Sequence, residues 1–182
     1  EEEEKNEKEK KDVIMVDQNF KYSHLYIKKF NTNIDTSKAE RITEGQYDVT
    51  SFDWHPNQKK IVFSHANEPT FNSRYISGDI SVVNISTKTV KDLVDSDGRD
   101  SSPIFSADGK RIAFISDGQK HEPIGLGDIY IVATNGGRPI KLGETPNRSA
   151  SIIKWSSDDN YIYASDANKT KSEIYKISIQ GN

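Results

Sequence analysis

The thirteen residues from His65 to Ser77, HANEPTFNSRYIS, carry the side chains of this chain that are best suited to bind a ligand. Phe71 and Tyr75 offer aromatic surface, and Arg74 carries a guanidinium fork that matches a carboxylate. Long connections on rigid scaffolds are where binding residues concentrate. We therefore expect His65, Phe71, Arg74 and Tyr75 to bind a substrate or partner, against the alternative of an ordinary mobile loop.

A second long connection, DGQKHEPIGLG, runs from Asp117 to Gly127 and contains His121. It occupies the same position as the first connection, one structural repeat later in the chain. The two connections would then form one lip of a binding surface, to which His121 contributes.

The residues give little support for a metal site, a calcium-binding loop or a serine nucleophile. The four histidines have no partner at i, i+4, and the chain has no cysteine, so we expect no metal site. The segment DSDGRD, Asp95 to Asp100, lacks the glycine and glutamate positions of a calcium-binding loop and suits a turn. No Gly-x-Ser-x-Gly motif is present. We expect no catalytic residue and no cofactor.

Charge and hydropathy restrict the partners. The net charge of −3 and a pI near 5.8 give no electrostatic basis for binding nucleic acid. No apolar run approaches the length of a membrane span. Residues 1–11, EEEEKNEKEKK, form a charged low-complexity flank. The sequence leaves the compartment open between the periplasm and the cytoplasm of a bacterium.

The elements that must position these residues come from an internal repeat. Trp54, Phe105 and Trp155 are spaced by 51 and 50 residues, and each precedes a hairpin-length turn. A β-branched strand begins seven residues after each aromatic residue, at Ile61, Ile112 and Ile162. We predict that the three aromatic side chains fill the core between neighbouring sheets.

A third strand follows in each repeat, starting at Asp79, Asp128 and Glu173 and alternating apolar with polar residues. A short fourth strand follows in the two middle repeats. The recurring acids indicate structural hydrogen bonds at the strand starts. Four strands at a period near fifty predict an all-β fold: a β-propeller fragment of four-stranded antiparallel blades.

We divide the chain into the flank, a partial blade at 12–44, complete blades at 45–95 and 96–144, and a partial blade at 145–182 that lacks its last strand. The segment DVIMV, residues 12–16, is the expected second strand of the first partial blade. Two complete and two partial blades indicate a piece of a longer propeller. A small self-sufficient propeller or closure by self-assembly is the alternative.

The segments SADGKRIAF and GDIYIVATNGG, Ser106–Phe114 and Gly127–Gly137, resemble the propeller repeat of the TolB family. That match weakens in the turns at Asn57–Lys59 and Asp158–Asn160. The stretch RITEGQYDVTSFDWHP, Arg41–Pro56, with the long connection after it, resembles the N-terminal propeller of the prolyl oligopeptidase family. The nearest branch is the dipeptidyl aminopeptidase or acylaminoacyl-peptidase type.

The second resemblance implies a propeller that gates an α/β-hydrolase domain with a Ser-Asp-His triad, a domain these residues do not contain. We therefore expect a non-catalytic fragment of the substrate-gating propeller of a serine peptidase, which meets a peptide substrate and the remainder of its propeller. The alternative is a TolB-like, WD-repeat-like module that binds a protein partner and carries no enzyme domain.

Overall fold

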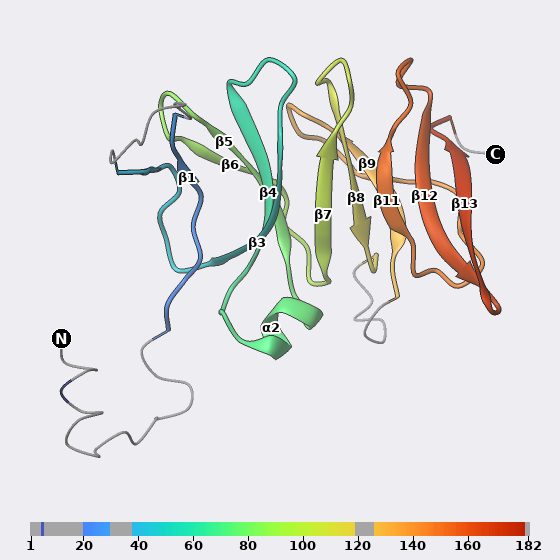
Figure 1. The fold of residues 1–182 in the computed structure, drawn as a ribbon, viewed down its shortest axis with the longest axis horizontal. Coiled ribbons are helices and arrows are strands. Elements are labelled where there is room, and N and C mark those ends of the chain that lie inside the picture. The colour runs from blue at the N-terminus through green and yellow to red at the C-terminus, as the bar shows by residue number, and fades with distance from the viewer. Residues whose placement is uncertain (1–4, 6–19, 30–37, 119–125, 181–182) are drawn as a thin grey trace.

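The computed structural model describes residues 5, 20–29, 38–118 and 126–180. Its described part consists of antiparallel sheets that stand side by side in chain order (Figure 1). Among the described residues, two sheets have four strands, one has three and one has two. The predicted fold class, an all-β propeller fragment with two complete and two partial blades, is confirmed.

The strands follow the chain from one edge of each sheet to the other, so consecutive strands are neighbours. The first sheet contains β1 (Tyr26–Ile27) and β2 (Glu40–Arg41). The second contains β3 (Asp48–Trp54), β4 (Lys60–Ala66), β5 (Asp79–Asn84) and β6 (Val90–Val94). The third contains β7 (Asp100–Phe105), β8 (Arg111–Ser116), β9 (Asp128–Ala133) and β10 (Ile140–Lys141). The fourth contains β11 (Ser151–Trp155), β12 (Tyr161–Asn168) and β13 (Lys171–Ser178).

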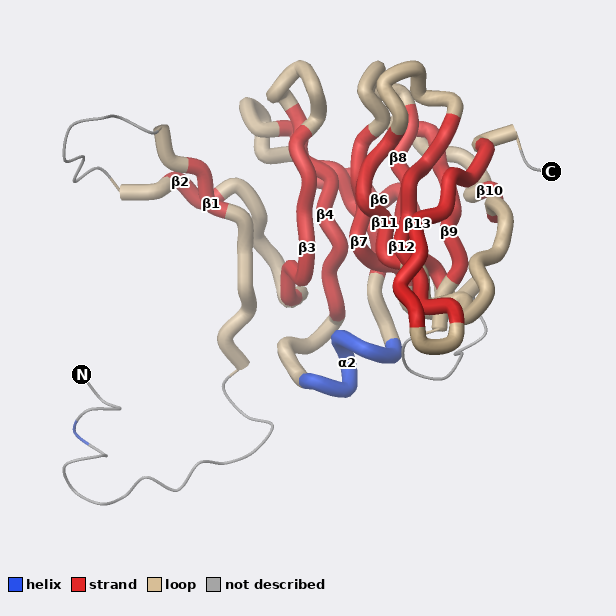
Figure 2. Tube along the Cα trace, turned by 45° about the vertical axis from the view of Figure 1, so that its right-hand side comes forward, coloured by secondary structure: helices blue, strands red, loops and turns tan. Residues whose placement is uncertain are grey.

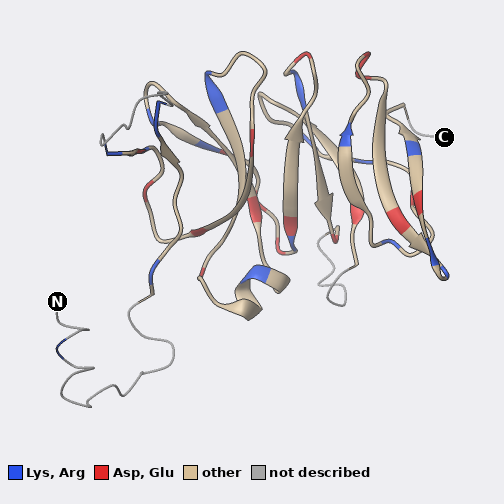
Figure 3. Cartoon of the chain, viewed as in Figure 1, with Lys and Arg blue, Asp and Glu red and all other residues tan. Residues whose placement is uncertain are grey.

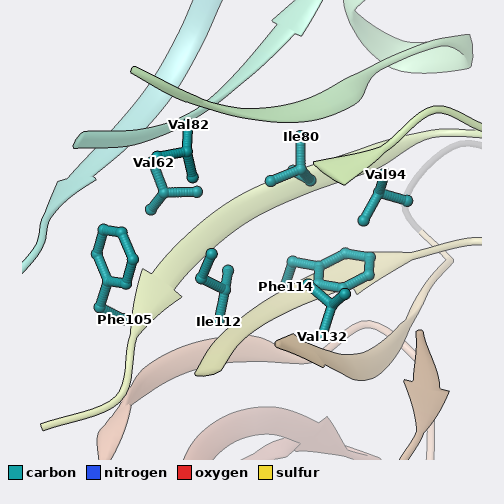
Figure 4. Close-up of a cluster of buried hydrophobic side chains, with 8 residues drawn as sticks. All are labelled: Val62, Ile80, Val82, Val94, Phe105, Ile112, Phe114 and Val132. Carbon is teal, nitrogen blue, oxygen red and sulfur yellow. The ribbon is translucent and has the colours of Figure 1, made fainter. Parts of the chain in front are cut away.

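Apolar side chains from facing sheets form the core. Alternation along each strand places one set of side chains on each face of its sheet. The cluster between the second and third sheets comprises Val62, Ile80, Val82, Val94, Phe105, Ile112, Phe114 and Val132 (Figure 4). A second cluster, which includes Ala113, Ile129 and Trp155, joins the third and fourth sheets. Each middle sheet is therefore apolar on both faces.

The prediction of a buried aromatic residue at each repeat is confirmed for Phe105 and Trp155, each 7% exposed, and is wrong for Trp54, which is 43% exposed. Phe105 and Trp155 pack against the sheet that precedes theirs. The sheet that precedes Trp54 has only β1 and β2 among the described residues. These strands pack against Ile61, Phe63 and Val83, and Trp54 is not part of that cluster.

Two further features differ from what the sequence indicates. The long connection after β4 contains a short helix, α2 (Phe71–Ile76), that the sequence analysis did not predict. The third strand of the last sheet begins at Lys171, two residues before Glu173. It begins early because Lys169, with a positive φ of 57°, makes a tight turn that pairs Asn168 with Lys171. The segment DVIMV lies outside the described residues.

No helix in the described part of the chain is long and apolar enough to cross a lipid bilayer.

We predict that Phe114→Ala lowers the free energy of unfolding by about 3–5 kcal/mol, because the side chain is fully buried between two sheets and leaves a cavity. The matched control is Phe52→Ala, since Phe52 is 56% exposed and should change stability by no more than about 1 kcal/mol. Urea unfolding followed by tryptophan fluorescence measures both. Equal losses in the two variants would show that the core does not lie between the sheets.

Candidate functional site

Helix α2 forms part of the connection from β4 to β5 and lies at one end of the sheets (Figure 2). Thr70 caps its N-terminus by accepting a hydrogen bond from the Ser73 amide at 3.1 Å. The helix buries none of its residues. Tertiary packing of an apolar face normally stabilises so short a helix. Because α2 has no buried face, its exposed apolar side chains indicate a binding surface.

A cleft of about 510 Å³ opens beside this helix, and we call it the α2 cleft. Its walls come from α2, from the start of β3 and from the start of β7, so it lies between two neighbouring sheets. The residues on which the argument below depends are Phe71, Arg74, Tyr75, Arg99 and Asp100. Three of them, Phe71, Arg74 and Tyr75, belong to the set expected from the sequence.

Arg74 is held by Asp48, the first residue of β3. The Nε and Nη2 atoms of Arg74 donate to Oδ2 of Asp48 at 2.8 and 2.7 Å. The carboxylate is fully buried and also accepts a hydrogen bond from the Ser23 amide at 2.9 Å. The guanidinium fork therefore has a carboxylate partner within the chain, and the ion pair fixes α2 against β3.

Two aromatic rings on α2 face the cleft. The ring centroids of Phe71 and Tyr75 are 4.5 Å apart, and the rings are 69% and 38% exposed. The guanidinium carbon of Arg99 lies 5.6 Å from the Tyr75 ring centroid, within the range of a cation–π contact. The rings give the cleft an apolar wall and hold a second arginine next to it.

The structure separates His65 from these residues. His65 lies on β4 and packs against Tyr47 and Phe63, on the face that looks toward the first sheet. Its Nε2 contacts the Ser81 hydroxyl at 2.9 Å, and Ser81 donates to Asp92 at 2.7 Å. Burial lowers the pKa of His65 and outweighs the nearby Asp92. His121 lies outside the described residues.

Acidic residues recur at the strand ends on the side of α2 (Figure 3). In the third sheet, Asp128 pairs with Lys141 at 2.8 Å and with Arg148 at 3.1 Å. Burial acts to raise the pKa of Asp128, but the hydrogen bonds from Arg148 and Lys141 prevail and lower it. In the last sheet, Glu173 is the third residue of β13 and accepts a hydrogen bond from the Tyr175 hydroxyl at 2.7 Å.

Asp79, at the equivalent position in the second sheet, lacks such a cation among the described residues. It accepts a hydrogen bond from the Ser96 amide at 3.3 Å. Burial raises the pKa of Asp79 to about 6, with further contributions from Asp95, Asp100 and Asp92. Burial also raises the pKa of Asp100. Within the described ranges, no group of three His, Asp or Glu side chains is arranged to hold a metal ion.

Sequence reasoning missed Arg99. It treated the segment that contains Arg99 as a turn between sheets, because Asp and Gly residues surround it. The available signal was spacing: Arg99 stands 51 residues after Asp48, as Phe105 stands 51 after Trp54, so the two occupy the same place at the start of an inner strand. Only the structure shows that this place lies opposite Tyr75.

We predict that Arg74→Gln lowers the melting temperature, because it leaves the buried Asp48 carboxylate without its cation. Arg74 is 46% exposed, so solvent screening reduces the cost to about 1–3 kcal/mol. The double variant Asp48→Asn with Arg74→Gln should recover part of this loss, since it removes the unpaired charge. Differential scanning calorimetry tests both, and a double variant less stable than Arg74→Gln would contradict the pairing.

We predict that Asp79→Asn raises the melting temperature at pH 7.5 and has little effect at pH 4. The native pKa of about 6 exceeds the unfolded value of 3.8, so native Asp79 holds its proton more tightly. The resulting stability is complete below about pH 4 and is lost as the pH rises through 6. Asp128→Asn is the control of opposite sign, because its lowered pKa makes the charged form stabilising. Melting curves of both variants between pH 4 and 8 test the prediction. A loss of stability at pH 7.5 in Asp79→Asn as well as in Asp128→Asn would contradict it.

Comparison with curated proteins finds partial sequence relatives. The chain is 29% identical over 82 residues to proteins named dipeptidyl-peptidase 5 from Trichophyton equinum and Arthroderma benhamiae. The match covers 44% of this chain and 11% of each relative. The chain thus spans a small part of the relatives it matches. No protein-family model matches it.

Comparison with solved structures finds propellers of several activities. An oligogalacturonate lyase from Vibrio parahaemolyticus superimposes with a TM-score of 0.61 at 14% identity, over 81% of this chain and 44% of the lyase. A protein assigned as a TolB from Agrobacterium tumefaciens gives 0.55 at 16% identity, over 79% and 50%. A prolyl endopeptidase gives 0.51 at 13% identity, over 74% and 21%.

At these identities the structural likeness establishes the fold, and the family resemblance rests on the sequence match to the dipeptidyl-peptidases. Together the two comparisons confirm the resemblance predicted from the sequence: this chain is similar to the β-propeller of prolyl oligopeptidase-family serine peptidases, with TolB-like repeats.

Proposed function

We propose that this chain is a non-catalytic part of a propeller that filters peptide substrates for a serine peptidase domain of the prolyl oligopeptidase type. The observation that carries the proposal is the 82-residue match to proteins named dipeptidyl-peptidase 5. The 182 residues contain no Gly-x-Ser-x-Gly motif, so the nucleophile would belong to another part of the protein.

The α2 cleft supports a role in handling peptides. It lies at the ends of β3 and β7, the first strands of their sheets, which in a propeller line the central channel. A peptide that enters the channel from this end meets Phe71 and Tyr75 first. In this proposal the two rings contact the peptide, Arg74 holds the helix that carries them, and His65 stiffens the strand from which the helix departs.

A TolB-like binding platform without an enzyme domain is the second candidate. The observation that favours it is the exposed apolar surface of α2, to which Phe71, Tyr75 and Ile76 contribute. Apolar patches of this kind mark protein-binding sites. A propeller solved in a nidogen/laminin complex also superimposes on this chain, with a TM-score of 0.58 at 14% identity. In this role a protein partner, in place of a peptide, would dock on α2.

The two functions are separated by sequencing the coding region for about 600 codons beyond Asn182, roughly the length of a further propeller half and a hydrolase domain. We expect further blades and then Gly-x-Ser-x-Gly, Asp and His in that order. The protein made in full should then react with a fluorophosphonate probe and lose that reaction when the motif serine is replaced by Ala. Blades followed by a stop codon would contradict the peptidase proposal and favour the binding platform.

A further inference from the structure

Arg99 lines the α2 cleft, and its backbone is held in place by the neighbouring strands. Its backbone forms a parallel bridge with Gly78, and the next residue, Asp100, donates its amide to the Gly78 carbonyl at 2.8 Å. The Arg99 carbonyl accepts the Asp117 amide at 3.2 Å. Position 78 needs glycine, because a Cβ there would lie 2.8 Å from the Asp100 carbonyl oxygen. The strand end that carries Arg99 is therefore fixed before any ligand arrives.

The guanidinium of Arg99 has an unused donor. Its Nε atom is buried and donates to no described atom. Arg99 also forms no ion pair with any carboxylate of the described residues. A buried donor without an acceptor is unfavourable, and it is uncommon in native structures. The Arg99 guanidinium therefore does not use its full hydrogen-bonding capacity within the described chain.

Arg99 supplies the available positive charge of the cleft. Arg74 and Asp48 neutralise each other through their ion pair. The Asp100 carboxylate is almost fully buried, and its Oδ2 accepts a hydrogen bond from the Ser96 hydroxyl at 2.7 Å. Arg99 remains as the cation without a counterion in this part of the described chain. A guanidinium that lines a cleft selects an anion, and its planar fork matches a carboxylate.

The apolar wall restricts what may stand next to that anion. The Arg99 guanidinium lies over the Tyr75 ring, and the Phe71 ring, which also lines the cleft, is 4.5 Å from Tyr75 between ring centroids. A side chain attached close to the carboxylate would therefore meet two aromatic rings. A peptide with an apolar last residue has this arrangement, because its C-terminal carboxylate and last side chain share one α-carbon.

We propose that the α2 cleft binds the C-terminal carboxylate of a peptide through Arg99 and its apolar last side chain through Tyr75 and Phe71. The anion site itself stands on the geometry of Arg99, whereas its use on peptides rests on the proposed function. Such a site would allow the propeller to recognise the C-terminus of a peptide.

Isothermal titration calorimetry on the full natural protein tests the site without any catalytic step. The probes are acetyl-Ala-Ala-Phe with a free carboxylate, the same peptide as its C-terminal amide, and acetyl-Ala-Asp-Ala-Phe amide, whose only carboxylate is a side chain. We expect the free acid to bind at least tenfold more tightly than the amide, as for loss of a charged hydrogen-bond partner. The aspartyl amide should bind as weakly as the plain amide. Equal binding of the acid and the amide would overturn the anion site, and tighter binding of the aspartyl amide would overturn the assignment to a peptide C-terminus.

Two variants assign the effect to Arg99. Arg99→Gln should abolish the preference for the acid, and Arg99→Lys, which keeps the charge but loses the fork, should retain a smaller preference. Arg138→Gln is the matched control, because it removes an exposed arginine that does not line the α2 cleft and should leave the preference unchanged. A full preference in Arg99→Gln would overturn the proposal. If the Gln variant does not fold, the wild-type comparison of acid and amide still decides the matter. Absence of a peptidase domain would remove the proposed function without changing these binding results.

Discussion

Every sheet in the middle of this structure is apolar on both faces, and this constraint determines the rest of the architecture. In the third sheet, Phe114 points toward the second sheet and Ala113 toward the fourth, and both are fully buried. Such a sheet exposes a large apolar area to water unless a neighbour covers each side. The stacking of sheets is therefore a condition of folding, and the exposure of Trp54 shows what happens where coverage stops.

The turns at the end of the sheets opposite α2 help to orient each sheet on its neighbour. The ring of His55 lies against Gly109 of the next sheet, where a Cβ would come within 2.4 Å of the ring, and Gly109 also has a φ of +70°. Asp159 accepts hydrogen bonds from the Ala107 and Asp108 amides of the preceding sheet, both at 2.7 Å. Packing alone is non-directional, so these turn-to-turn contacts help to fix the register of each sheet on its neighbour.

The repeat in the sequence predicted most of the fold because each repeat satisfies the same constraint. The strands that start at Asp79 and Asp128, and the burial of Phe105 and Trp155, follow from periodicity and turn residues that any reader of the sequence can count. The features that the sequence did not predict are those that depend on a neighbouring sheet or on a single capped turn. The exposure of Trp54 depends on which strands stand beside it, and α2 depends on Thr70 and on the ion pair of Arg74 with Asp48. The pairing of Arg99 with Tyr75 joins residues from two sheets and has no local signature.

The same constraint explains why the site lies where it does. Side chains in the middle of a strand are committed to the faces between sheets, so they cannot change without loss of the core. The strand ends are not so committed, and on the α2 side they differ from sheet to sheet. Asp128 is neutralised by two cations, whereas Asp79, at the same position one sheet earlier, has no such cation among the described residues and has a raised pKa. The second sheet also carries α2, and the next strand end presents Arg99. The irregular features of the chain thus meet between the second and third sheets, on a scaffold whose regular packing keeps them in place, which is how a common fold acquires an individual site.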